Sequence, residues 1–357
     1  CSKSTTWRRT RTSAPSPLTG EKPASKIQTI GNVQYYIDGK DFVALAPSVA
    51  RDLLTTITLD SRTTEINQCA FIDFLGLTSI TLPSSLKSIG DYAFDGCCVL
   101  VEVYNYSENV EVTLGNTNYN VNGYLGEYAK VIYNSSELTG EYPASKIQTI
   151  NSVQYYVQGD DFIALGPSVA RNSLTTLTLD SRTTEIRPYA FKNCTSLIRV
   201  DLSNCISLTS IGSYAFNECS RLKGELDLSN CTSLASIGSY AFNECSRLNS
   251  VTLPSSLTSV GDRVFYYCSK FTRVDLSNCT SLTNIGSAAF GYLEKVRSVT
   301  INQYVFENVT SSSFSCGNLL NNISSGETVL VPANLIDDLH LTNSYLDDES
   351  EFTRSAT

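Results

Sequence analysis

One phrase of thirteen residues occurs twice in this chain. The letters SIGSYAFNECSRL stand at residues 210–222 and return at residues 236–248, 26 positions further on. A catalytic site needs one copy of its residues, whereas a stack of similar structural units needs many. The phrase therefore predicts a repeat architecture.

Shorter variants of the phrase extend the repeat along the chain. Each variant has a Phe after Ala or Val, and these residues are Phe71, Phe94, Phe191, Phe216, Phe242, Phe265 and Phe290. They are 23 residues apart in the first run and 25, 26, 23 and 25 apart in the second. The short form reads VTLPSSLTSVG and the long form VDLSNCTSLTNIG. We expect the length to vary at one place only, the turn after the strand.

Residues 248–268 indicate what one repeat does. Alternation in a strand turns Val251 and Leu253 to one side and Ser250 and Thr252 to the other, while Phe265 fills the interior from the far side. One such unit cannot bury its apolar side alone, but stacked units bury like residues on like. The sequence predicts a mainly β, right-handed solenoid, with a parallel sheet on the concave face and short strands and turns on the convex face.

A second, longer repetition interrupts the solenoid. The segment that begins LTGEKPASKIQTI at Leu18 returns as LTGEYPASKIQTI at Leu138, offset by 120 residues without gaps. Each copy contains two strand-like runs around a turn with glycine, QYYIDGKDFVAL and QYYVQGDDFIAL, which is the signature of a β-hairpin. We call each copy a β cassette.

These patterns divide the chain into seven segments. In order, they are a disordered tail (1–17), a β cassette (18–54), a short repeat run (55–104), an irregular connecting repeat (105–137), a second β cassette (138–173), the main repeat array (174–303) and an atypical C-terminal capping segment (304–357).

The stretch LTSIGSYAFNECSRLNSVTLPSSLTSVGDRVF resembles the BspA-like leucine-rich repeat family of surface proteins. The ending VLVPANLIDD also resembles the terminal segment of that family. The resemblance implies a cell-surface or secreted protein that adheres to surface or matrix proteins of a host or a neighbouring cell.

Composition limits the partners and the location. The net charge of −9 argues against nucleic acid and anionic membranes as main partners. No apolar run approaches the roughly 18 residues of a spanning helix, so no transmembrane segment is expected. The first residue, Cys1, stands where a mature lipoprotein carries its acyl chains. A lipid anchor there is one hypothesis, and an arbitrary start of the sequence is the other.

The cysteines follow the repeat. Most of the twelve lie either three residues after the repeat Phe or at the end of DLSNC, which favours two ladders of buried, reduced thiols. An occasional bridge such as Cys205–Cys231 stays open. No metal-site spacing or cofactor motif is found, and the single histidine, His340, lies outside the array. We expect no cofactor and no enzymatic activity.

The outward positions of the strands are the candidate binding site. They vary from repeat to repeat, and in the main array they comprise Arg199, Asp201, Glu225, Asp227, Ser250, Thr252, Arg273 and Asp275. Asp201 and Asp227 are expected on adjacent strands, where like charges repel and could recruit a cation or a basic side chain of a partner. The alternative is that these residues only keep an exposed sheet soluble. At the level of function, adhesive protein binding competes with a structural spacer or coat component.

Overall fold

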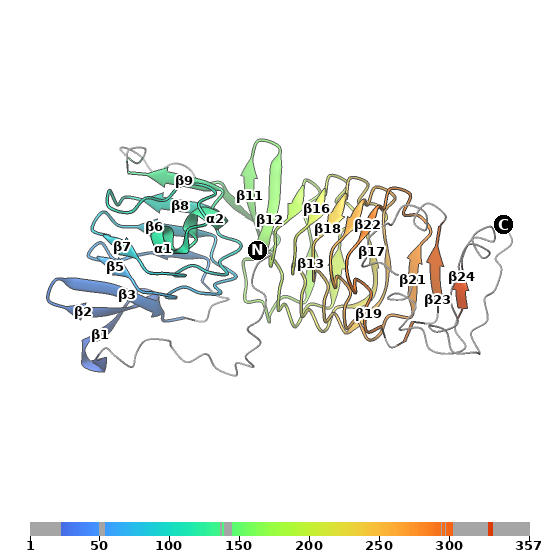
Figure 1. The fold of residues 1–357 in the computed structure, drawn as a ribbon, viewed down its shortest axis with the longest axis horizontal. Helices are drawn as coiled ribbons and strands as arrows, with labels where there is room; N and C mark the ends of the chain where they lie inside the picture. Colours follow the sequence, from blue (N-terminus) through green and yellow to red (C-terminus); the bar gives the residue numbers. More distant parts are fainter. Residues whose placement is uncertain are drawn as a thin grey trace. The chain divides into compact units, whose positions relative to one another are not determined.

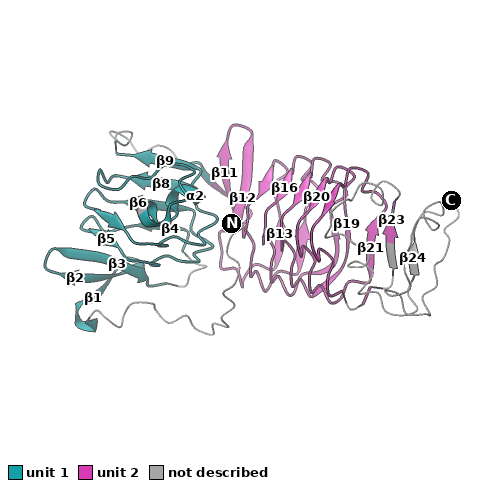
Figure 2. Cartoon of the chain, viewed as in Figure 1, with its two compact units in different colours: residues 1–147 teal, residues 148–357 magenta. Residues whose placement is uncertain are grey.

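The computed structural model describes residues 23–49, 54–135, 138, 145–293, 295–296, 298–302 and 328–330. Cys1, His340, the predicted tail and most of the predicted capping segment lie outside this set. The chain forms two compact units, Cys1–Ile147 and Gln148–Thr357 (Figure 2). Each unit is described by itself.

Both β cassettes fold as antiparallel three-stranded meanders. Their strands are β1 (Ile27–Ile30), β2 (Val33–Asp38) and β3 (Asp41–Pro47), and β10 (Ile147–Ile150), β11 (Val153–Gln158) and β12 (Asp161–Pro167). The predicted hairpins are confirmed: Asp38 pairs with Asp41 around Gly39, which has a φ of 61°. Glycine suits this turn because it adopts a positive φ without steric cost.

The last strand of each cassette continues into a sheet of two-residue strands. In unit 1 the sheet order is β1-β2-β3-β5-β7, and in unit 2 it is β10-β11-β12-β14-β16-β18-β20-β22. The added parallel strands are β5 (Glu65–Ile66), β7 (Ser88–Ile89), β14 (Glu185–Ile186), β16 (Ser210–Ile211), β18 (Ser236–Ile237), β20 (Ser259–Val260) and β22 (Asn284–Ile285). In each unit the cassette therefore lies at the start of the coil stack and shares one continuous hydrogen-bonded sheet with it.

The strand-like run of each repeat forms the opposite sheet. In unit 1 it comprises β4 (Thr56–Thr58), β6 (Ser79–Leu82), β8 (Glu102–Asn105) and β9 (Val131–Asn134). In unit 2 the strands are β13 (Thr176–Thr178), β15 (Arg199–Asp201), β17 (Lys223–Asp227), β19 (Arg247–Thr252), β21 (Arg273–Leu276), β23 (Ser298–Ile301) and β24 (Thr328–Leu330). The described helices are short: η1 (Ala24–Lys26), α1 (Tyr119–Asn122) and α2 (Leu125–Tyr128). The predicted mainly β solenoid is confirmed (Figure 1).

The length of the repeat varies at a second place, so the expectation of a single variable turn is wrong. The 26-residue repeat carries its extra residue in the strand, where Lys223-Gly224-Glu225 replaces Ile198-Arg199. Gly224 has a φ of 83°, and the pairing of β17 with β19 shifts register at this residue. An extra residue bends a strand and disrupts its ladder. The sheet of unit 2 is accordingly split, with β13-β15 on one side and β17-β19-β21-β23-β24 on the other.

The core of unit 2 is a stack of like residues. The rings of Phe191, Phe216, Phe242, Phe265 and Phe290 follow one another at centroid distances of 5.1–5.5 Å, with interplanar angles of 5–21°. All five are buried in one cluster with the repeated Leu, Ile, Ala and Cys residues. This confirms that each coil presents the same cross-section to the next. In unit 1 the ring of Phe71 stacks on that of Phe94 at 5.2 Å.

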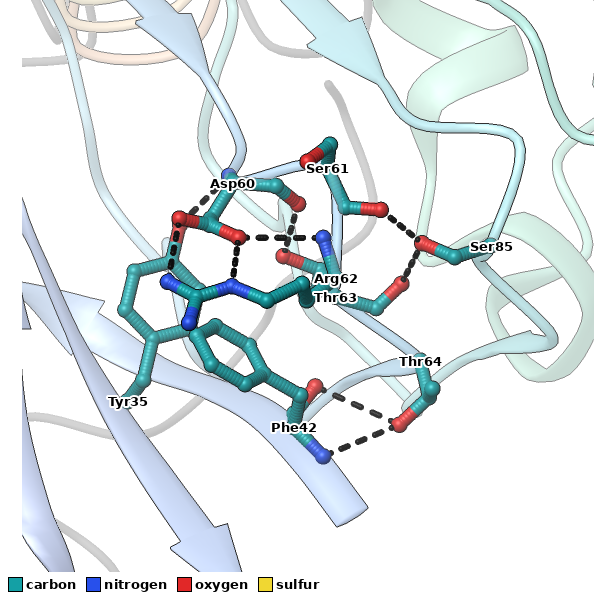
Figure 3. Close-up of polar contacts among 8 residues, drawn as sticks. All are labelled: Tyr35, Phe42, Asp60, Ser61, Arg62, Thr63, Thr64 and Ser85. Atoms are coloured by element: carbon teal, nitrogen blue, oxygen red, sulfur yellow. Dashed lines mark hydrogen bonds and ion pairs between the residues drawn. The ribbon is translucent and has the colours of Figure 1, made fainter. Parts of the chain in front are cut away.

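A polar network joins the unit 1 cassette to its first coil (Figure 3). The buried Tyr35 hydroxyl accepts a hydrogen bond from the Asp60 amide at 3.0 Å. Arg62 forms two hydrogen bonds with the Asp60 carboxylate and lies 4.5 Å over the Phe42 ring. The Thr64 hydroxyl bonds to both backbone groups of Phe42.

Unit 2 repeats this network. The Tyr155 hydroxyl accepts from the Asp180 amide at 3.0 Å, and Arg182 bonds the Asp180 carboxylate while lying 4.3 Å over the Phe162 ring. The duplicated DSRTT sequence therefore has a structural role, which is to fix the cassette on the coils.

Candidate binding surface

The eight predicted site residues lie on the long strands of unit 2, and we call them the strand face. Arg199 and Asp201 are on β15, Glu225 and Asp227 on β17, Ser250 and Thr252 on β19, and Arg273 and Asp275 on β21. All eight are exposed or half-buried, whereas of the residues between them Leu226, Val251 and Val274 are buried and Val200 is partly buried against the core. The predicted alternation is therefore confirmed.

Register pairs bring several of these residues together. Glu225 lies opposite Ser250, Asp227 opposite Thr252, and Thr252 opposite Asp275. The Thr252 hydroxyl donates a hydrogen bond to the Glu225 carboxylate at 2.5 Å. From β17 to β21 the strand face is a connected polar surface.

The aspartates of the strand face close the turns that follow their strands. The carboxylate of Asp201 accepts from the backbone amide and the hydroxyl of Ser203, at 3.1 and 2.7 Å. Asp227 and Asp275 accept in the same way from amides two residues on, each at 2.9 Å. Such Asx turns are a recurrent use of Asp in loops. The aspartate of DLSN thus has a structural role besides its charge.

Hydrogen bonding also affects the acidity of two of these carboxylates. Donation by Ser203, from its hydroxyl and its amide, lowers the pKa of Asp201. Burial raises the pKa of Asp275. Hydrogen bonds from Ser277 and the positive charge of Arg273, which forms an ion pair with Asp275, outweigh this effect, so the pKa lies below its usual value. Both side chains are therefore anionic at neutral pH.

Asp201 and Asp227 lie on neighbouring strands, as expected, because the Lys223 amide at the start of β17 donates to the Ile198 carbonyl beside β15 at 3.1 Å. They are not register partners in one ladder, however, since β15 and β17 belong to different sheets, and on its other side Asp227 pairs with Thr252. The cause is the extra residue at Gly224, which shifts β17. Among the described residues, no cluster of His, Cys, Asp or Glu side chains is suited to hold a metal ion.

The cysteine ladders are as predicted, with one contact that the sequence did not suggest. The ten cysteines of the described residues are thiols rather than disulfides, Cys205 and Cys231 included, and nine of them are buried. The thiols of Cys219, Cys245 and Cys268 each donate to the carbonyl of the repeat Phe in the preceding coil, at 3.2–3.3 Å. Burial raises the pKa of Cys205 to about 12 and that of Cys231 to about 11, so these thiols are poor nucleophiles.

A row of tyrosines on the turns was not singled out from the sequence. The rings of Tyr189, Tyr214 and Tyr240 stack at 4.9 and 4.7 Å, one from each successive coil. All three have a φ near 60°, an unusual conformation for a bulky residue. The triplet YAF, which ends in the repeat Phe at Phe191, Phe216 and Phe242, is the signal that would have found them.

The family follows from the same repeats. A family profile described as "BspA type Leucine rich repeat region" matches six copies, over residues 50–122, 170–234 and 225–332, which is well over half of the chain. The chain belongs to the BspA type leucine rich repeat family. The match confirms the resemblance drawn from the repeat motif, and in unit 1 it extends the repeats to residue 122.

Solved structures of bacterial leucine-rich repeat proteins are similar to this BspA type protein. One from Eubacterium ventriosum is 18% identical, with 80% of this chain and 89% of that chain covered and a TM-score of 0.43. The pneumococcal vaccine antigen PcpA is 14% identical, with 93% and 99% covered and a TM-score of 0.44. One from Bacteroides ovatus is 17% identical, with 92% and 100% covered and a TM-score of 0.27. No curated protein sequence matches the chain.

The described part of this BspA type protein contains no helix that is both long and apolar enough to cross a membrane.

Proposed function

We propose that this chain is a cell-surface or secreted protein that binds other proteins through the strand face of unit 2. The partners would be surface or matrix proteins of a host or a neighbouring cell. The observation that carries the proposal is the contrast within each coil: inward positions repeat, while the outward positions of β15, β17, β19 and β21 differ in charge from coil to coil. A surface that served only solubility would need no such variation.

Two further points support the proposal. Membership of the BspA type family is consistent with a cell-surface or secreted location. Leucine-rich repeat proteins typically act by binding rather than by catalysis, and we assign no catalytic role to the chain.

A charge-neutral variant tests the proposal. In Asp201→Asn/Asp227→Asn/Asp275→Asn, each amide oxygen can still accept the turn hydrogen bond, so only the charge is lost. We expect the full chain to bind at least one member of a panel of purified matrix and bacterial surface proteins, and the variant to bind it at least tenfold more weakly and with less dependence on salt. Asp41→Asn/Asp160→Asn/Asp161→Asn, in the exposed hairpin turns, is the control. Equal binding by the two variants, or no binding by the wild type, would refute the proposal.

The second candidate is a spacer or coat component without a specific ligand. The duplication of cassette plus coils favours it, because repeating a complete unit adds length to a chain without adding a new surface. A spacer would tolerate every substitution on the strand face with no change in protein binding.

A further inference from the structure

Five basic residues form a row beside the strand face, and we call them the basic row. They lie where the chain enters the long strands, in four successive coils of unit 2, and they are Arg221, Lys223, Arg247, Lys270 and Lys295. All five are exposed, and four of them directly precede a buried residue of the core. None belongs to the strand face, so the inference does not depend on the proposed function.

Backbone pairing places these residues next to one another. Lys223 is the register partner of Arg247. In the next coil the amide of Thr272 donates to the carbonyl of Asn249 at 2.9 Å, which aligns the residues two positions earlier, Lys270 and Arg247. Since neighbouring parallel strands are about 4.8 Å apart, successive charges of the row are separated by roughly that distance along the coil axis.

The charges in the row crowd one another. The pKa of Lys270 is lowered chiefly by the neighbouring ammonium of Lys295, and Arg247 lowers it further. Like charges on adjacent strands destabilise a sheet. Within the described part of the chain, no carboxylate forms an ion pair with any of the five, although the chain as a whole has a charge of −9.

The coil itself does not require basic residues here. In unit 1 the position five residues after the repeat Phe holds Gly76 and Val99, both buried. In the first coil of unit 2 it holds Ser196, and only the next four coils carry Arg or Lys. A repulsive feature that structure does not need, and that is confined to consecutive coils, points to an anionic ligand.

We propose that the basic row binds a linear anionic polysaccharide, whose sulfate or carboxylate groups pair with successive coils. A polymer with charges that recur along one axis matches a row of cations on a regular stack, and binding it would relieve the repulsion between them. Asn249 and Thr272, both exposed beside the row, offer an amide and a hydroxyl for sugar hydroxyl groups. The row itself has no aromatic side chain on which the bases of a single-stranded nucleic acid could stack.

Affinity measurements on the full chain test this proposal. The probes are heparin, which is sulfated, polygalacturonate, which is carboxylated, neutral dextran, and duplex DNA as a competing class of anionic polymer. We expect binding to at least one of the two anionic polysaccharides and none to dextran. Comparison of heparin with polygalacturonate shows whether sulfate or carboxylate groups are preferred. Arg247→Gln/Lys270→Gln is expected to weaken binding at least tenfold and to reduce the slope of log K against log salt concentration by about one to two, because fewer counterions are displaced.

Two controls separate the row from general charge and from misfolding. Lys40→Gln/Lys87→Gln removes the same charge from exposed positions of unit 1 and should leave binding unchanged. The midpoint of thermal unfolding of Arg247→Gln/Lys270→Gln should equal or exceed that of the wild type, since repulsion is removed. The proposal fails if both double variants lose affinity equally, if neither anionic polymer binds, or if duplex DNA binds more tightly than both polysaccharides.

Discussion

At the scale of single residues, aspartates and their Arg or Ser partners shape the turns of this protein. Asp60 and Asp180 each anchor an arginine two residues on, and this arginine also covers an aromatic ring of the cassette. Asp201, Asp227 and Asp275 accept from amides at the same spacing. One residue type thus serves both the attachment of the cassettes and the turns below the strand face.

The acid response of unit 2 should depend on Asp180. Hydrogen bonds from Arg182 lower the pKa of this carboxyl, and burial opposes them only in part. Because the pKa of Asp180 is lower in the folded than in the unfolded state, where it is about 3.9, the ionised carboxylate stabilises the fold above about pH 3.9. This stabilisation is lost as the pH falls through the folded-state pKa. In Asp180→Asn, the denaturation midpoint should therefore fall less steeply below pH 4 than in the wild type. An unchanged steepness would contradict this role, and Asp60→Asn should behave alike in unit 1.

At the scale of elements, each cassette is held on its stack by a buried tyrosine hydroxyl. Tyr155→Phe leaves the Asp180 amide without this acceptor. A buried donor that loses its partner costs about 1–3 kcal/mol. We expect a drop of that size in the free energy of unfolding of unit 2, measured by denaturant titration. Tyr35→Phe is the matched variant for unit 1, and no effect in either unit would show that the contact does not hold the cassettes.

The stacked phenylalanines make the coils mutually dependent. Phe242 lies between Phe216 and Phe265, and its ring is fully buried. Phe242→Ala should cost about 3–5 kcal/mol, because it removes the buried ring and leaves a cavity. Ile206→Ala, at a side chain that is 59% exposed, should change stability by less than about 0.5 kcal/mol. Calorimetry of the two variants checks this, and similar losses in both would contradict a single stacked core.

At the scale of the whole molecule, the sequence predicts most of the fold and only part of the site. The Phe, Leu and Cys spacings are enough to predict the coils, because identical cross-sections must stack. The split between β15 and β17 could not be inferred from the turn lengths, since its cause is one glycine inside a strand. The turn role of Asp201 depends on backbone geometry that a strand pattern does not contain. Aligning the coils would have shown the basic row, but its residues come before the alternating outward positions from which the binding site was predicted.

The central claim is that consecutive coils stack in register and leave the strand face open. Cysteine pairs test this directly. Glu225→Cys/Ser250→Cys joins register partners, and Glu225→Cys/Arg273→Cys spans two strands, about 10 Å apart. A disulfide requires Cα atoms within about 7 Å. On mild oxidation of the folded chain, the first pair should form an intramolecular disulfide quickly and the second should not. Equal bridging in both pairs, or none in the first, would contradict the account.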